Sequence, residues 1–129
     1  MAQSTQQTWT EDELTLIEGA DEISVAPARA DGTFCRPVVI WVVRVGDDLY
    51  VRAYRGVDTT WYRQALARRE GEILVGRVHK GVNFLDVSHS LADDIDAAYV
   101  SKYHRYPASY TEGITSPKCR ATTFRLEPH

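Results

Sequence analysis

The stretch FCRPVVIWVVRV, residues 34–45, restricts the fold of this chain more than any other part of its sequence. In a β-strand, successive side chains point to opposite faces. Between Val38 and Val45, both alternating sets are almost entirely apolar. A strand with two apolar faces has to be covered on both sides. The sequence therefore predicts a strand that faces the interior of a barrel on one side and a helix or a second subunit on the other.

Patterns before and after this strand predict the rest of the architecture. Apolar and β-branched runs between turn residues indicate further strands, and capping residues followed by amphipathic spacing indicate helices. We expect strands at residues 21–28, 49–54, 71–78, 82–88 and 119–127, with a hairpin turn at 79–81, helices at 10–20, 59–70 and 90–107, and an irregular connection at 108–118. Thr10 and Glu13 have the spacing of a capping box. About six mostly antiparallel strands with two or three peripheral helices predict a mainly β (α+β) fold, a small barrel.

Length and composition limit the class of protein. The 129 residues suit one domain, which we expect at residues 9–129 after a flexible N-terminus at residues 1–8. The formal net charge of −3, with scattered Lys and Arg, argues against a duplex nucleic-acid partner. No apolar run approaches the about 18 residues needed to cross a bilayer, and the first residues do not resemble an export signal. We therefore expect a cytoplasmic protein without membrane or nucleic-acid partners, whose Cys35 and Cys119 are free thiols.

Standard motifs for metal or phosphate chemistry do not occur. The glycines lack the spacing of a phosphate-binding loop. The histidines are isolated from one another and from the cysteines in the sequence, so we expect no metal site.

The most informative polar segment is YVRAYRGVDTTWYRQALARR, residues 50–69. Arg52 and Tyr54 share one face of the expected strand with Tyr50, and Arg55 ends it. A guanidinium offers a fork of donors to phosphate or carboxylate, and Tyr and Trp rings can form walls for a flat ring system. The alternative is cross-strand packing on a half-exposed sheet face with solvated arginines. The residue pattern leaves both interpretations open.

Under the first interpretation, one pocket is bordered by Arg52, Tyr54, Arg55, Trp61 and Tyr62. Arg52 or Arg55 would hold an anionic group, and the glycine after them would allow close approach of the backbone. Free amides at the N-terminus of the helix at 59–70 would favour the same anion. As a partly exposed side chain, either arginine is expected to contribute little to folding.

Other candidates lie toward the C-terminus. Lys102 continues the apolar stripe of the helix at 90–107, so it either extends past the core to water or points into a pocket. Ser116, Lys118 and Arg120 fall near the start of the expected last strand, where they could bind an anion or face water.

Four segments in order resemble an uncharacterised bacterial family, domain of unknown function 2255. They are IWVVRVGDDLYVRAYRG, WYRQAL, IDAAYVSKY and SPKCRATTFRL. The resemblance runs from about Trp9 to the C-terminus. The family name implies no activity.

A second resemblance covers residues 36–78, which look like the middle of the deazaflavin-dependent nitroreductases, members of the flavin-binding split-barrel group. Those proteins have a strand hairpin, a glycine, and a Pro-Trp-Tyr helix start followed by Leu and Ala. Trp61, Tyr62, Leu66 and Ala67 match this pattern, whereas Thr60 replaces the proline. The basic glycine-rich segment that helps to hold the cofactor's anionic tail in that family is reduced here to ARADGTFCRP. The resemblance implies a split β-barrel, with FMN or a deazaflavin as cofactor.

Three functions remain open at this point. The first is a flavin- or deazaflavin-dependent oxidoreductase acting on a small molecule. The second is a small-ligand-binding module that performs no chemistry and needs no cofactor. The third is a cofactor-free enzyme that uses Tyr, Lys or His side chains for acid–base catalysis. In each case the doubly apolar strand favours a homodimer. The residues expected to bind a cofactor are Arg52, Tyr54, Arg55, Gly56, Trp61 and Tyr62.

Overall fold

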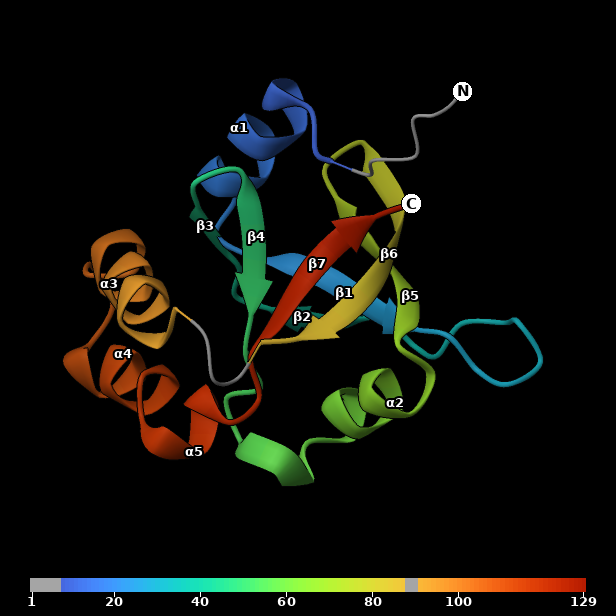
Figure 1. Ribbon diagram of the computed structural model, residues 1–129. Coiled ribbons are helices and arrows are strands. Elements are labelled where there is room, and N and C mark those ends of the chain that lie inside the picture. The colour runs from blue at the N-terminus through green and yellow to red at the C-terminus, as the bar shows by residue number, and fades with distance from the viewer. Residues whose placement is uncertain (1–7, 88–90) are drawn as a thin grey trace.

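Figure 1 shows the computed structural model, which describes residues 8–87 and 91–129. Within these residues the chain forms seven β-strands, five α-helices and one 3-10 turn. The strands are β1 Ile23–Pro27, β2 Val38–Ile40, β3 Val43–Val45, β4 Asp48–Val51, β5 Glu70–Val75, β6 Val78–Asp86 and β7 Phe124–Pro128. The helices are α1 Glu11–Gly19, α2 Thr60–Arg68, α3 Ala92–Lys102, α4 Ala108–Ile114 and α5 Pro117–Arg120, and the 3-10 turn is η1 Gly56–Asp58. Residues 1–7 of the N-terminus expected to be flexible lie outside the described residues.

All seven strands belong to one antiparallel sheet, in the order β2-β1-β5-β6-β7-β4-β3. The two edge strands, β2 and β3, are consecutive in the sequence and are joined only by Trp41 and Val42. Because this short connection holds the two edges of the sheet together at one end, the sheet curls into a half-barrel (Figure 1). The mainly β, split-barrel fold predicted from the sequence is confirmed.

The stretch at residues 34–45 is not the single strand that its pattern predicts, because the chain turns a corner at Trp41 and Val42. Side chains from the end of α3 bind the backbone of Val42 at this corner. The Val42 amide donates a hydrogen bond to Tyr103 Oη (3.2 Å), and Lys102 Nζ donates one to the Val42 carbonyl (2.8 Å). The corner therefore leaves neither backbone group of Val42 unsatisfied. It also divides one expected strand into β2 and β3, which raises the expected six strands to seven.

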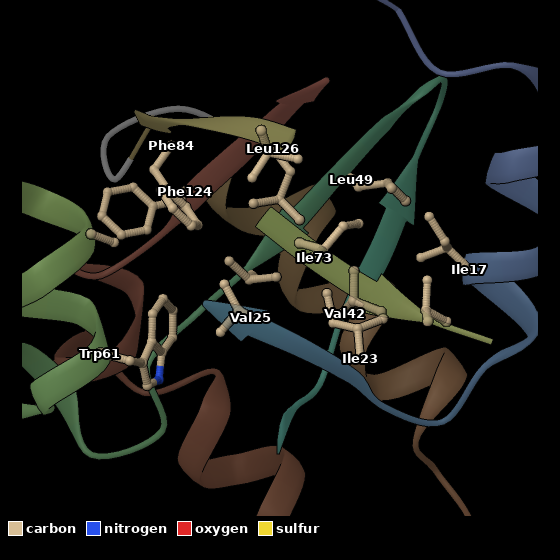
Figure 2. Close-up of a cluster of buried hydrophobic side chains, with 14 of the residues drawn as sticks. Ile17, Ile23, Val25, Val42, Leu49, Trp61, Ile73, Phe84, Phe124 and Leu126 are labelled. Carbon is tan, nitrogen blue, oxygen red and sulfur yellow. The ribbon is translucent and has the colours of Figure 1, made fainter. Parts of the chain in front are cut away.

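Apolar side chains form two clusters, one on each side of the sheet. The larger cluster fills the inside of the half-barrel and includes Leu49, Ile73 and Phe124 (Figure 2). The smaller cluster lies between the sheet and α3 and includes Ile95 and Tyr99. The helical layer that contains α3, α4 and α5 lies beside β3 and β4. Helix α2 lies away from this layer, where β5 begins (Figure 1).

The prediction of two covered faces holds for one half of the doubly apolar stretch and fails for the other. Val42 is fully buried in the larger cluster, and Val43 is 1% exposed in the smaller one. A helix, α3, covers this second face at β3. By contrast, Val38 and Val39 on β2 are 37% and 57% exposed. The corner turns β2 away from the face that α3 covers, so these two valines remain accessible.

The first helix begins as its sequence predicts. Thr10 Oγ1 accepts from the Glu13 amide (3.1 Å), and the Glu13 carboxylate accepts from the Thr10 amide (2.9 Å), which completes the capping box. Trp9 is buried just before the cap and donates its indole N–H to the Leu126 carbonyl at 2.9 Å. These contacts attach α1 to the open end of the half-barrel.

Several expected boundaries are wrong: β4 ends at Val51 and α3 at Lys102, both earlier than expected, and three further segments differ. The segment at 108–118, expected to be irregular, forms α4 and α5, because Pro107 and Ser116 take the N-cap positions and Pro117 occupies the first turn. The hairpin between β5 and β6 turns at residues 76–77 instead of 79–81, since Gly76 adopts a φ of 55° and Val75 pairs with Val78. Finally, β7 starts at Phe124, five residues later than expected.

Cys35 and Cys119 are both buried, free thiols. No helix within residues 8–87 and 91–129 is long and apolar enough to span a membrane.

Candidate functional site

A pocket of about 730 Å³ lies where the β2 edge of the sheet meets the helical layer. Its wall comes from three segments that are distant in the sequence. The first is residues 38–41 of β2 and the corner, the second lies between residues 52 and 61, and the third lies between residues 106 and 114. Glu22, which precedes β1, adds a carboxylate to the wall. In Figure 1 the second segment runs through η1 between α5 and α2.

Of the six residues expected to bind a cofactor, four line this pocket: Arg52, Tyr54, Arg55 and Trp61. Tyr54 and Arg55 are exposed to it because β4 ends at Val51 and the chain leaves the sheet before them. Arg55 forms no hydrogen bond or ion pair with any described residue. Its guanidinium is therefore available to a ligand.

Arg52 differs from Arg55 because it is 2% exposed and its side chain is fully buried. Its Nη1 donates to Asp96 Oδ1 (2.5 Å) and to the Ile114 carbonyl (3.1 Å), and its Nε donates to Thr123 Oγ1 (2.9 Å). The premise that this arginine is partly exposed is wrong, so the small contribution to folding that was expected from it no longer follows. The interpretation of solvated arginines on a wet sheet face is also wrong for Arg52, although it describes the exposure of Arg55.

Asp96 on α3 binds a second arginine as well. Arg120 of α5 donates from Nε to Asp96 Oδ2 (2.8 Å) and forms a further ion pair with it through Nη2. The same carboxylate raises the pKa of the Arg120 guanidinium above its usual value. Arg120 therefore lies in a helix and pairs with Asp96, and it is not a cation at the start of a strand. The Arg52–Asp96–Arg120 group links β4, α3 and α5 behind the pocket wall.

The Trp-Tyr pair at the start of α2 divides its two rings between different surroundings. Trp61 is 4% exposed and belongs to the larger cluster, where it lies next to Phe124 (Figure 2). It also lines the pocket. Tyr62 stacks on Phe124 with ring centroids 5.1 Å apart and does not line the pocket. The two residues are adjacent on a helix and so point in different directions, and only Trp61 can contact a ligand there.

Gly56 is required for a turn and does not line the pocket. Its φ of 84° is in the region that favours glycine, and a Cβ at this position would lie 2.6 Å from Lys118 Cγ. The absence of a side chain at Gly56 therefore makes room for the Lys118 side chain and not for a ligand in this pocket.

Aromatic rings from the corner, from the segment after α3 and from α4 contact one another beside the pocket. Trp41 stacks in parallel on the buried ring of Tyr103, with centroids 3.8 Å apart. It also contacts Tyr106 at 5.3 Å and Tyr110 at 6.4 Å, and Tyr110 in turn lies 6.4 Å from Tyr54. These rings form a continuous aromatic wall from the corner to the end of β4.

Two buried polar atoms of pocket-lining residues have no hydrogen-bond partner among the described residues: Arg52 Nη2 and Thr59 Oγ1. Thr59 is the N-cap residue of α2, but its side chain makes no capping hydrogen bond. Buried polar atoms in proteins are almost always satisfied. Their position at the pocket favours an acceptor group supplied from outside the chain.

The accessible charges around the pocket are few and mixed. Like Arg55, the carboxylates of Glu22 and Asp58 form no hydrogen bond or ion pair with described residues. Because Asp96 neutralises Arg52, the accessible charges are one guanidinium and two carboxylates. The pocket is therefore not a uniformly basic site.

Lys102 does not line the pocket, and it does not extend freely to water. Its Nζ caps the Val42 carbonyl, and burial lowers the pKa of the amine to about 8. No histidine within the described residues lines the pocket, and no cluster of three His, Cys, Asp or Glu side chains that could hold a metal is found there.

Of the aromatic wall, the sequence pattern predicts only Tyr54 as a pocket residue. Trp41 was assigned to a regular strand, and the segment carrying Tyr110 and Ile114 was expected to be irregular. A usable signal exists, because Tyr106, Tyr110 and Ile114 follow one another at i, i+4 and i+8 and lie on the same wall. The proline at 107 obscured that spacing.

A family comparison identifies the chain's relatives. Residues 13–126 match the family described as "Uncharacterized protein conserved in bacteria (DUF2255)". The chain belongs to this family. The match confirms the resemblance carried by the four sequence motifs. No curated protein sequence matches this DUF2255 protein.

Three solved structures illustrate the similarity in fold. HutZ, the heme storage protein from Vibrio cholerae, has a TM-score of 0.63 and 11% identity, covering 92% of this chain and 89% of that chain. An FAD-binding protein from Mesorhizobium loti has a TM-score of 0.59 and 16% identity, with coverages of 95% and 92%. An F420 reductase has a TM-score of 0.53 and 15% identity, with coverages of 94% and 96%. At these identities the likeness concerns the fold alone, and it agrees with the expected split-barrel architecture.

Proposed function

We propose that this DUF2255 protein binds a flavin-type cofactor, FMN or a deazaflavin, and acts as an oxidoreductase on a small molecule. The observation that carries the proposal is the pairing, in one pocket, of the flat ring of Trp61 with the unpaired guanidinium of Arg55. Proteins of the same fold include an FAD-binding protein and an F420 reductase, which supports a cofactor of this class.

The residues of the pocket fit the two parts of such a cofactor. Trp61 and the half-buried Ile40 offer an apolar surface to a fused ring system. Arg55 and the unpartnered Thr59 Oγ1 at the uncapped start of α2 would hold an anionic tail. The tail would keep away from Glu22, whose carboxylate repels it. When bound, the cofactor would supply hydride chemistry, while these residues hold its ring and tail and exclude water.

The proposal is tested by adding FMN and a deazaflavin separately to the purified protein and measuring binding by fluorescence. Arg55→Ala should weaken binding about ten- to hundredfold, as expected for the loss of a charge-assisted hydrogen bond of about 1.5–3 kcal/mol. Arg63→Ala is the matched control, because Arg63 is exposed on α2 and does not line the pocket. Failure of both cofactors to bind would refute the proposal. Binding of a cofactor whose reduced form transfers no hydride to any added small molecule would favour the small-ligand-binding module instead.

We also propose that the protein forms a homodimer through the β2 edge. The exposed Val38 and Val39 lie on an edge strand whose outer backbone groups face no other strand of the sheet. Val39→Lys should convert the dimer to a monomer in sedimentation velocity, and a wild-type protein that sediments as a monomer would contradict the assignment. The cytoplasmic location expected from the sequence remains a prediction.

A further inference from the structure

The aromatic wall of the pocket has a surface that core packing does not explain. Tyr54 and Tyr110 are 47% and 46% exposed, and both lie against the same cavity as Trp41. Large apolar side chains that gather around a concave surface commonly mark a binding site. The contacts proposed for the cofactor, which are Ile40, Arg55, Thr59 and Trp61, do not include these rings.

The wall is also held rigidly before any ligand arrives. Trp41 stacks on Tyr103 with their planes only 3° apart, and Tyr103 is itself fixed by a hydrogen bond from its hydroxyl to the Asp21 carbonyl (2.8 Å). Tyr106 is held by Arg105, whose guanidinium lies 5.1 Å from the ring centroid. One face of Tyr106 is therefore occupied by a protein cation, which leaves Trp41, Tyr110 and Tyr54 to contact a ligand.

Charge decides which ligand suits this wall. Ile23 and Ile40 form the last pair of their antiparallel ladder, so Glu22, just before β1, and Trp41, just after β2, lie at the same end of this strand pair. The Glu22 carboxylate is exposed, lines the pocket and is unpaired among the described residues. Aromatic faces attract cations through the negative potential above the ring, and a nearby carboxylate adds to that attraction. An anionic group would instead meet repulsion from Glu22.

We propose that the aromatic wall is a second subsite of the pocket that binds an organic cation, such as a quaternary ammonium group, carried by the substrate. The inference rests on the proposed function, because it assigns the substrate class of the same pocket. Trp41, Tyr110 and Tyr54 contact the cation, and Glu22 supplies the opposite charge. Arg55 remains available to the anionic part of the cofactor.

Calorimetric titration of the protein without flavin tests the subsite. The probes are choline and 3,3-dimethylbutan-1-ol, in which a carbon atom replaces the quaternary nitrogen and removes the charge. Choline should bind about five- to thirtyfold more tightly, as expected for a partly desolvated cation–π site. Equal affinities, or no binding of choline, would overturn the proposal.

Variants assign the effect to the named residues. Glu22→Gln and Tyr110→Leu should each reduce choline binding several-fold and leave the binding of the neutral probe unchanged. Glu112→Gln is the matched control, because Glu112 is an exposed carboxylate on α4 that does not line the pocket. An unchanged preference for choline in both Glu22→Gln and Tyr110→Leu would place the cation elsewhere and refute the subsite.

The two proposals fail separately. Arg55→Ala should weaken flavin binding and leave the preference for choline intact. Glu22→Gln should reduce the preference for choline without weakening flavin binding. A protein that selects choline but binds no flavin would refute the cofactor proposal alone. A protein that binds flavin but does not distinguish the two probes would refute the cation subsite alone.

Discussion

Replacing Arg52 by Ala should destabilise the fold strongly, although the residue lies in a segment whose sequence suggests a surface role. The substitution removes three hydrogen bonds, to Asp96, Ile114 and Thr123, and leaves the Asp96 carboxylate without one of its two arginine partners. Removing one member of a buried ion pair typically costs about 3–5 kcal/mol. Asp96 keeps Arg120, and its side chain is 15% exposed, so the expected loss is near the lower limit, about 3 kcal/mol.

The matched control is Arg55→Ala, three residues along the same segment. Arg55 is exposed and makes no bond to a described residue, so its removal should change the free energy of unfolding by less than about 0.5 kcal/mol. Urea unfolding of both variants measures the difference, provided that the slope of free energy against urea stays constant.

A double-mutant cycle with Asp96→Ala tests the cause. If the ion pair accounts for the loss, the costs of Arg52→Ala and Asp96→Ala should be non-additive by about 1–3 kcal/mol. Two results would refute the reasoning: a loss for Arg52→Ala no larger than that for Arg55→Ala, or costs that add within about 0.5 kcal/mol.

Two further predictions follow from burial. Trp61→Ala should lower the free energy of unfolding by about 3–5 kcal/mol, because the ring is 4% exposed against Phe124; a loss below about 1 kcal/mol in urea unfolding would contradict this packing. For Lys102, burial lowers the pKa of the amine from 10.5 to about 8, so between these pH values the native state binds fewer protons than the unfolded chain and stability due to this residue rises with pH. The stability of wild type relative to Lys102→Met, measured as unfolding free energy, should therefore increase from pH 8 to pH 10. Because the amine is partly exposed, the increase should be smaller than the limiting slope of about 1.4 kcal/mol per pH unit. A difference that stays constant with pH would contradict the buried position.

Local patterns predicted those parts of the fold that local interactions determine. The capping box at Thr10 forms because its two partners are three residues apart. The prediction that Tyr50 and Arg52 share one face of the strand is confirmed, because Tyr50 lies in the smaller cluster and Arg52 binds Asp96 of α3, whereas Leu49 and Val51 lie in the larger cluster. Both predictions need only the geometry of one element. The fold class followed because many short strands with intervening turns have few alternatives to a barrel.

The burial of Arg52 could not be predicted in the same way. Its partner Asp96 lies 44 residues away, and only the packing of α3 against the sheet brings the two together. Without that knowledge, an arginine on a strand is more often solvated. For the same reason, the sequence could not show that Trp61 lines the pocket and Tyr62 does not. The two residues are adjacent on α2, and the side on which the pocket lies depends on the tertiary packing.

The corner at Trp41 and Val42 connects these observations. Had residues 38–45 formed one straight strand, Val38 and Val39 would have continued the faces that Val42 and Val43 bury, and β2 would not have reached the far edge of the sheet beside β1. Lys102 and Tyr103, at the end of α3, bind the Val42 backbone. The chain can therefore turn there from β2 into β3. The turn moves β2 away from the helical layer and leaves Trp41 between them, with Tyr103 behind its ring and the pocket in front. The accessible valines, the aromatic wall and the cavity therefore have a common cause, the division of one apolar stretch between the two edges of the sheet. A substitution at Lys102 or Tyr103 should alter the shape of the pocket as well as the stability of the fold, although neither residue lines it.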